Sequence, residues 1–259
     1  SEGTNAWLKL STTAERIHHH CSVSCATHRC SHRNPNLAQV PSEDRFRRLF
    51  VPTEGQLLCG ADLSGIELRM LAHYLARYDG GRYADILLNG DIHQTNADKI
   101  GISRRAVKTV TYAFLYGAGD LKLGQSFDKQ LSDKEARAKG KEIRAAYIDA
   151  IPGLADLLSA IKTAGGRGYI KALDGRKIIL DSPHKALNFC LQSGAGVVAK
   201  RWLVIANDMS KQFCCSQLGF IHDEIQYEVD PEHGENLRFA LELAAVQAGE
   251  YYKMRLPIA

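Results

Sequence analysis

Two acidic residues in apolar segments constrain the fold of this chain more than any other feature. Asp62 lies near the end of the apolar run 57–63, and Asp223 closely follows Phe220 and Ile221. They are 223 − 62 = 161 positions apart, so only a folded sheet could bring them together. An acid in an apolar strand costs free energy unless it has a partner, and a pair of metal ions is such a partner.

Length and composition are those of an ordinary globular protein. The chain has 259 residues, of which 45% are hydrophobic and 24% charged, enough for one large domain or two closely joined ones. The net charge of +4 is compatible with a polyanionic ligand but does not by itself indicate one. No apolar run reaches about 18 residues, and the start Ser1-Glu2-Gly3-Thr4 is not a signal peptide. We therefore expect a soluble, cytoplasmic protein without a membrane partner.

Seven cysteines, an odd number, favour a reducing compartment over a disulfide framework. Residues 18–32 contain several zinc-type ligands, but their C-x3-C-x4-C spacing matches no recognised zinc ribbon or finger. A polar, basic loop is the simpler interpretation, and a zinc-binding interaction module stays open as an alternative. The ligands in question are His18, His19, His20, Cys21, Cys25, His28, Cys30 and His32.

Periodicity and turn residues predict the main elements. Residues 57–63 read as a buried strand, Ser64-Gly65 as a turn and 66–78 as a helix, which places Asp62 at a strand end. The small residues 193–196 imply close approach by another backbone or by a ligand. The other expected elements are a helix-like pattern in 1–20, a loop over 22–41, helices over 133–150, 154–164, 186–209 and 232–252, a hairpin of 169–173 with 177–180, and a second hairpin of 213–218 with 220–229, interrupted at Gly219 and with His222-Asp223-Glu224 at or near the bend.

A helix capped by Ser103 is expected to carry Arg104, Lys108, Tyr112 and Tyr116 on nearly one face, because they recur every four positions. Two cations one turn apart can grip a polyphosphate, and an aromatic ring one turn further can stack on a base or sugar. The alternative is a solvated cationic face with two core tyrosines.

Three segments together resemble the palm and fingers of a family A DNA polymerase of the bacteriophage branch. The stretch from Asp62 to Arg69 resembles motif A, Arg104 to Gly117 resembles the fingers helix called motif B, and His222-Asp223-Glu224 resembles motif C. The resemblance extends from 5–10, through 35–39, to the last helix. It implies template-directed DNA synthesis, with primer–template DNA and a deoxynucleoside triphosphate (dNTP) as partners.

The resemblance also implies a metal site. Asp62, Asp223 and the backbone carbonyl of Leu63 would hold two Mg²⁺ ions, with Glu224 as an auxiliary acid beside them. Magnesium prefers oxygen ligands and keeps several waters, which suits a site with few carboxylates.

Roles in nucleotide and DNA binding follow from the same resemblance. Arg104, Lys108 and His93 would bind the triphosphate, and Tyr112 would stack on the sugar and base. Glu67, held by a hydrogen bond from Tyr116, would exclude a ribose 2′-hydroxyl, which argues against a related single-subunit RNA polymerase. The expected DNA contacts are Arg29, Asn188, Gln192, His222 and, at the tip of the first hairpin, Arg176.

The chain departs from the family pattern at Thr27-His28-Arg29, where Thr-Gly-Arg is usual, and it begins after the expected thumb and exonuclease domain. It also stops before the closing segment expected after Ala259. We therefore expect a polymerase fragment from a phage-infected or prophage-carrying bacterial cell, with a separate chain or clamp as a further partner for processivity. A non-catalytic DNA-binding remnant is the alternative.

The expected fold class is α/β (α+β): an antiparallel palm sheet carries the carboxylates, and a helical fingers subdomain is inserted into it. The expected divisions are 1–78 for the first part of the palm, 79–181 for the fingers and 182–259 for the second part of the palm.

Overall fold

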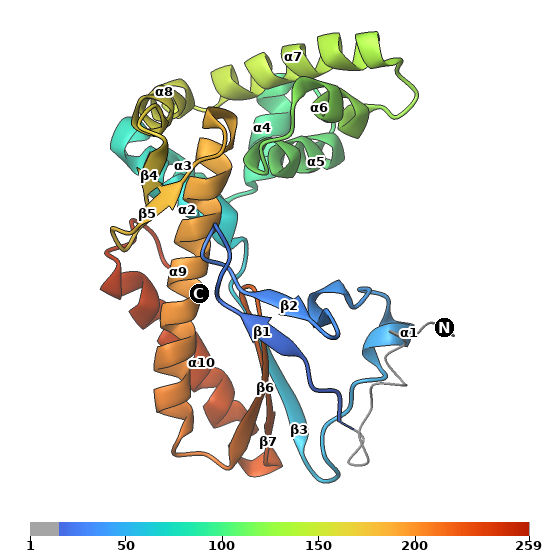
Figure 1. Ribbon diagram of the computed structural model, residues 1–259, viewed down its shortest axis with the longest axis vertical. Helices are drawn as coiled ribbons and strands as arrows, with labels where there is room; N and C mark the ends of the chain where they lie inside the picture. The colour runs from blue at the N-terminus through green and yellow to red at the C-terminus, as the bar shows by residue number, and fades with distance from the viewer. Residues whose placement is uncertain (1–15, 259) are drawn as a thin grey trace. The chain divides into compact units, whose positions relative to one another are not determined.

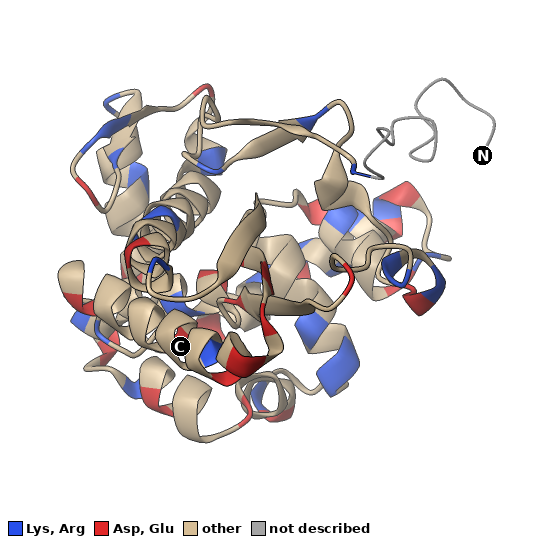
Figure 2. Cartoon of the chain, turned by 90° about the horizontal axis from the view of Figure 1, so that it is seen from below, with Lys and Arg blue, Asp and Glu red and all other residues tan. Residues whose placement is uncertain are grey.

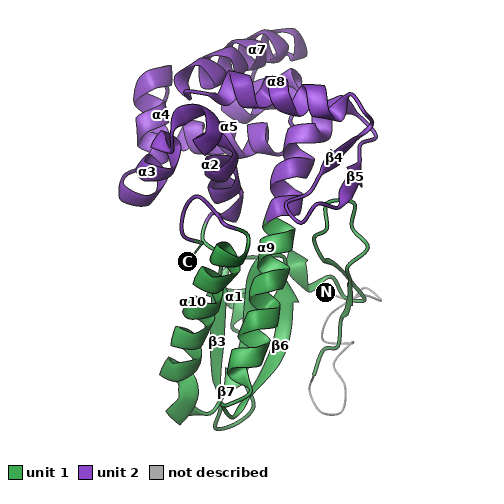
Figure 3. Cartoon of the chain, turned by 90° about the vertical axis from the view of Figure 1, so that its left-hand side faces the viewer, with its two compact units in different colours: residues 1–64, 195–252, 258–259 green, residues 65–194, 253–257 purple. Residues whose placement is uncertain are grey.

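The computed structural model describes residues 16–258, which form two compact units (Figure 1, Figure 3). Of the described residues, unit 1 comprises 16–64, 195–252 and 258, and unit 2 comprises 65–194 and 253–257. The helix-like pattern expected in residues 1–20 falls largely outside the described residues, as does the family-like stretch 5–10. No helix within residues 16–258 is long and apolar enough to cross a membrane.

Unit 1 is built on an antiparallel sheet with strand order β3-β7-β6, formed by β3 (Leu57–Asp62), β7 (Glu224–Val229) and β6 (Cys215–Ile221). In the central strand β7, Ile225, Tyr227 and Val229 are buried and alternate with half-buried residues. This alternation is typical of a sheet with one face on a core. Helix α10 (Gly234–Tyr251) contacts β3 and follows the short η4 (Pro231–His233). The expected mixed fold with an antiparallel sheet is confirmed.

Strand β3 differs from its prediction in burial. The sequence predicted a buried strand, but Leu57 and Leu58 are 47% and 43% exposed. Among the described strands β3 pairs with β7 alone, so it lies at an edge of the sheet. An apolar run cannot by itself distinguish an edge strand from a central one, because burial depends on neighbours supplied by distant parts of the chain.

The β6–β7 hairpin also differs in detail. The interruption expected at Gly219 is a shift of register inside β6, between Gln217 and Gly219, rather than the end of the strand. The chain reverses three residues later, at the turn His222-Asp223, as expected, and His222 has φ of 58°. Two-residue hairpin loops favour such positive φ values.

Residues 22–41 are less irregular than expected. Strands β1 (His20–Ser22) and β2 (Ser31–Arg33) form an antiparallel hairpin, followed by η2 (Leu37–Gln39) and α1 (Asp44–Arg47). Most of 22–41 is therefore irregular, as expected, and the prediction missed β2 and η2, because three-residue elements are too short for a periodic pattern to appear.

Unit 2 is mainly helical. Ser103 Oγ accepts a hydrogen bond of 3.2 Å from Ala106 N at the start of α5, as predicted, and Ser132 with Glu135 forms a capping box on α7. The helices are α2 (Ile66–Asp79), α3 (Arg82–Asn89), α4 (Ile92–Ile100), α5 (Arg104–Leu115), α6 (Asp120–Phe127), α7 (Asp133–Ala150) and α8 (Leu154–Gly165).

Two glycines allow α6 and α7 to cross closely. A Cβ atom on Gly124 would lie 1.9 Å from the carbonyl oxygen of Ala136, and one on Gly140 would lie 1.8 Å from that of Asp120. Any larger residue would force the helices apart, so this crossing requires glycine at both positions.

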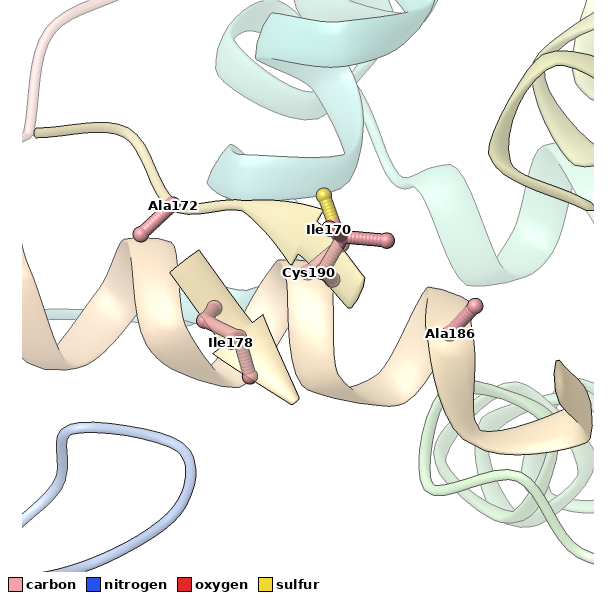
Figure 4. Packing of buried hydrophobic residues seen from close by; sticks show 5 residues of the cluster. All are labelled: Ile170, Ala172, Ile178, Ala186 and Cys190. Carbon is pink, nitrogen blue, oxygen red and sulfur yellow. The ribbon is translucent and has the colours of Figure 1, made fainter. Parts of the chain in front are cut away.

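The hairpin of β4 (Tyr169–Lys171) and β5 (Lys177–Ile179) leads through η3 (Pro183–Lys185) into the long helix α9 (Ala186–Ser210). Ile170, Ala172 and Ile178 form an apolar cluster with Ala186 and Cys190 from the first turns of α9 (Figure 4). Burial raises the pKa of the Cys190 thiol to about 11, so this thiol stays protonated in the cluster.

Helix α9 runs from unit 2 into unit 1, changing unit between Gly194 and Ala195. A Cβ atom on Gly194 would lie 2.3 Å from the Met70 side chain, and one on Gly196 would lie 3.0 Å from the carbonyl oxygen of His28. The close approach of another backbone, predicted for the small residues, is thus confirmed at Gly196. The observed boundaries at 64/65 and 194/195 differ from those expected at 78/79 and 181/182, and the palm–fingers division stays a prediction.

Candidate active site

The carboxylates of unit 1 lie where β3 and β7 meet. Asp62, the last residue of β3, is opposite Glu224, the first residue of β7. The backbone N–H of Leu63 donates a hydrogen bond of 3.0 Å to the carbonyl oxygen of Asp223. The hairpin therefore brings the chain around Asp223 next to Asp62, which is 161 positions away in the sequence, at an edge where Asp62 is exposed. The predicted proximity of motifs A and C is confirmed at the level of the backbone.

Glu224 is oriented by a residue that the sequence did not indicate. Gln226, two residues further along β7 on the same face, donates a hydrogen bond from Nε2 to Glu224 Oε1. Gly60, the residue opposite Gln226 on β3, leaves room for this amide, since a Cβ there would lie 2.9 Å from it. The period of two along a strand could have indicated Gln226, once the strand was known to carry a site.

His222, at the turn, packs edge-on against His32 of β2, with ring centroids 5.7 Å apart. The ring of His19 also lies near that of His32, with centroids 5.4 Å apart. His32 is 7% exposed, and burial, followed by the neighbouring His19 and His222, lowers its pKa. The uncharged imidazole of His32 therefore packs against the turn that carries Asp223 at neutral pH.

The segment around Arg29 is held against α9 by its backbone. His28 has φ of 61°, in the left-handed region where glycine is favoured, and a Cβ on Gly196 would lie 3.2 Å from Arg29 N. This left-handed conformation explains why glycine is usual at the position of His28 in the family pattern. Histidine is one of the residues that tolerate the conformation. The structure locates Arg29 in unit 1 beside α9, half-buried.

In unit 2, helix α5 presents the predicted face. Arg104, Lys108 and Tyr116 are exposed and Tyr112 is half-buried, whereas Val107, Val110 and Phe114 are buried. The tyrosines are therefore not core residues, and that part of the alternative interpretation is wrong. Tyr116 lies just past the end of the helix, as its C-cap.

Arg104 is positioned by Asp91, which sequence reasoning missed as a partner. Arg104 Nε donates a hydrogen bond of 2.6 Å to Asp91 Oδ2, and Asp91 also caps α4 by accepting bonds from His93 N and Gln94 N. The hydrogen bond from Arg104 and that from Gln94 N hold the pKa of Asp91 below its usual value. Asp91 directly precedes a helical pattern, and this position could have indicated its role as a helix cap.

His93 lies beside this pair, with its ring centroid 6.2 Å from that of Tyr112. It is 8% exposed, and burial lowers its pKa, as do the charges of Arg104 and Lys108. His93 is therefore neutral at pH 7, and its contact with a phosphate would be a hydrogen bond rather than an ion pair.

Glu67 and Tyr116 form the hydrogen bond expected from the resemblance. Tyr116 Oη donates to Glu67 Oε1 at 3.0 Å, and Glu67 is 8% exposed on α2. Burial, followed by the negative charge of Glu67, raises the pKa of Tyr112.

The remaining expected DNA contacts have neighbours within unit 2. Asn188 Nδ2 donates a hydrogen bond of 3.1 Å to the carbonyl oxygen of Leu115, at the end of α5. Gln192 is half-buried one turn further along α9, and Arg176, at the tip of the β4–β5 hairpin, pairs with Asp174 at 2.5 Å. Asn188 therefore helps to fix the end of α5.

The histidines and cysteines of 18–32 do not form a metal cluster: within the described part of the chain, no three of their ligand atoms lie within 4.8 Å of one another. Cys30 is instead buried next to the Cys21 thiol, and burial together with this neighbour raises its pKa to about 11. Elsewhere, acidic and basic residues are interspersed along the helices (Figure 2), in keeping with the small net charge.

Comparison with known proteins agrees with this geometry. The sequence profile of DNA polymerase family A matches residues 2–259, and the chain belongs to this family. It is 34% identical to the DNA-directed DNA polymerases of Escherichia phage T7 and Enterobacteria phage T3, over 87% of this chain. These alignments cover 37% of each phage protein, so the chain spans little more than a third of their length.

A solved structure gives the same fold. The POL domain of Pol1 from M. smegmatis, in complex with DNA primer-template and dNTP, superposes with a TM-score of 0.83 at 26% sequence identity. The match covers 98% of this chain and 48% of that chain. The fold of the whole chain is therefore that of a family A polymerase domain.

Proposed function

We propose that this chain carries the nucleotidyl-transfer centre of a template-directed DNA polymerase, which adds a dNTP to a primer 3′-hydroxyl. The observation that carries the proposal is the backbone bond between Leu63 and Asp223, which brings motifs A and C together at one sheet edge. Family membership supports the reaction class.

Asp62, Asp223 and the Leu63 carbonyl would hold two Mg²⁺ ions. The donor set supports this choice, because magnesium prefers hard oxygen ligands and these residues offer oxygen alone. When bound, the ions would lower the pKa of the primer hydroxyl and neutralise charge on the triphosphate and pyrophosphate. Glu224, oriented by Gln226, would add negative charge beside them.

The nucleotide would be held by side chains of unit 2. Arg104, fixed by Asp91, keeps other guanidinium N–H groups for a phosphate, and Lys108 adds a second cation one turn along α5. Neutral His93 would add a hydrogen bond. Tyr112, half-buried, offers a ring face for stacking on the sugar and base.

Primer–template DNA would be contacted by Arg29, His222, Asn188, Gln192 and Arg176. Contacts to the backbone and minor groove would sense pairing geometry without reading sequence. A separate chain or clamp would then supply processivity. Salt-dependent binding of a primer–template duplex by the chain, measured by fluorescence anisotropy, tests this part of the proposal.

A primer-extension assay tests the chemistry. Asp62→Asn and Asp223→Asn should each reduce the rate by about 10²–10⁴-fold, since a metal site supplies several kcal/mol of transition-state stabilisation. Asp156→Asn, an exposed acid on α8, is the matched control and should extend normally. Extension that survives both active-site substitutions would refute the proposal.

The same experiment separates a polymerase from a DNA-binding remnant. Anisotropy should show that Asp62→Asn and Asp223→Asn still bind the duplex. If the unsubstituted chain binds the duplex in a salt-dependent way but extends no primer with Mg²⁺ and all four dNTPs, the remnant is the correct description.

A further inference from the structure

A second group of metal-ligand side chains lies in unit 1, outside the residues assigned above. The Sγ of Cys214, a carboxylate oxygen of Asp230 and an imidazole nitrogen of His233 all lie within 4.8 Å of one another. Among residues 16–258, this is the one group of three or more cysteine, histidine or acidic side chains at this spacing.

Backbone hydrogen bonds hold the three residues together. Asp230 N donates to the carbonyl oxygen of Cys214 at 3.0 Å, and His233 N donates to that of Asp230 at 2.9 Å. Cys214 directly precedes β6, Asp230 directly follows β7, and His233 ends η4 before helix α10. The sheet register therefore assembles the group without needing an ion.

The group is remote from the catalytic carboxylates. Asp223 precedes the first residue of β7 and Asp230 follows the last, so the strand separates them by about 20 Å at roughly 3.3 Å per residue. A metal at one end would not share ligands with a metal at the other.

The chemistry of the donors selects the ion. A thiolate, an imidazole and a carboxylate suit Zn²⁺, whereas Mg²⁺ and Ca²⁺ prefer oxygen alone. Ionised Cys214 and Asp230 would supply two negative charges against the two positive charges of the ion. The oxygen donors of Asp62 and Asp223 favour Mg²⁺ instead. The two ends of the sheet would therefore bind different metals.

The surroundings of the group are those of a metal site. Gln56 Nε2 donates a hydrogen bond to Asp230 Oδ1 and so orients the carboxylate. Metal-binding carboxylates are commonly oriented by such hydrogen bonds. His233 Nδ1 is buried and makes no hydrogen bond with any described residue, although the Glu232 carboxylate lies 3.9 Å away and adds negative potential. A buried imidazole nitrogen without a donor or acceptor loses free energy that an ion would restore.

We propose that Cys214, Asp230 and His233 bind one Zn²⁺ ion, with water in the fourth position, and that the ion ties the open end of the β6–β7 hairpin to the start of α10. The ion would stabilise the fold of unit 1 and take no part in nucleotidyl transfer. Zinc would stabilise the folded chain by binding it in preference to the unfolded chain.

Metal titration of the untagged full chain tests the proposal, with Co²⁺ as a spectroscopic probe and Zn²⁺ as competitor. The chain should bind one equivalent with the charge-transfer band of a cobalt–thiolate bond. Cys214→Ser should abolish this band, and His233→Gln should weaken binding by more than about 100-fold, beyond the effect of losing a supporting residue. Gln56→Ala should weaken binding by about 10- to 100-fold.

Two controls make the test specific. Cys215→Ser, the adjacent cysteine outside the group, should keep the band, and so should Cys21→Ser/Cys30→Ser, which removes thiols of the histidine-rich segment. Zinc should raise the melting temperature of the unsubstituted chain and not that of Cys214→Ser, whose circular dichroism reports whether it folds. A band that survives Cys214→Ser, or a chain that binds no metal, would overturn the proposal.

Discussion

Tyr116 Oη lies 3.0 Å from Glu67 Oε1 and donates a hydrogen bond to it, which joins the end of α5 to the first turn of α2. The two residues are 49 positions apart, and the carboxylate is 8% exposed while the tyrosine is 49% exposed. The bond fixes a carboxylate whose position would decide which sugar fits, so substitutions at Tyr116 should act through Glu67.

Tyr116→Phe should reduce discrimination against ribonucleotides by about 10-fold, because a hydrogen bond to a charged group contributes about 1.5–3 kcal/mol and part-exposure lowers that value. Single-nucleotide incorporation of ribo- and deoxyribonucleotides measures the ratio. The double variant with Glu67→Ala should match Glu67→Ala alone. Additive effects would mean that Tyr116 acts by another route.

His28→Gly should raise the free energy of unfolding by about 1 kcal/mol, because His28 adopts a left-handed conformation that costs a side-chain-bearing residue about that much. Urea unfolding followed by circular dichroism measures the change. His28→Ala is the control: it removes the imidazole but keeps a Cβ, so it should bring no gain. An equal gain in both variants would assign the effect to the imidazole.

Gly196→Ala should lower the free energy of unfolding by about 1–3 kcal/mol, because the new methyl group would lie 3.0 Å from the carbonyl oxygen of His28. The displacement of Arg29 should also weaken duplex binding in the anisotropy assay. Gly219→Ala is the matched control in the same unit, since a Cβ there meets no atom within 4 Å. If both variants lose the same stability, the contact with His28 is not the cause.

Acid should destabilise the chain partly through His73. Burial, followed by the charge of Arg255, lowers the pKa of His73, and His73 Nδ1 accepts a hydrogen bond of 3.2 Å from Arg255 N. The unfolded chain therefore binds a proton more readily than the folded chain, so the stability contributed by neutral His73 is present above about pH 6.5 and is lost as the pH falls below it.

The measurement is the free energy of unfolding between pH 7.5 and 5.5. His73→Gln should reduce its dependence on pH, while His184→Gln, at an exposed histidine, serves as the control. An unchanged slope in His73→Gln would show that other groups account for the acid sensitivity.

Sequence patterns located most helices and the residues of the candidate site because their causes are local. Each of these patterns acts over one or two helical turns: the Ser103 cap, the four-residue spacing on α5 and the small residues 193–196 of α9. The structure has all three where the sequence predicted them. The Glu67–Tyr116 hydrogen bond was predicted from the family resemblance, because residue spacing alone does not indicate it.

Asp62 shows the limit of what local sequence patterns can predict. The sequence by itself determined that this acid ends a strand and needs a partner. Only the tertiary structure decided that β3 is an exposed edge strand, that its register sets Asp62 opposite Glu224, and that the other end of β7 brings Cys214, Asp230 and His233 together. The pairing, register and burial of β3 depend on β7, a segment more than a hundred positions away, so no local pattern encodes them.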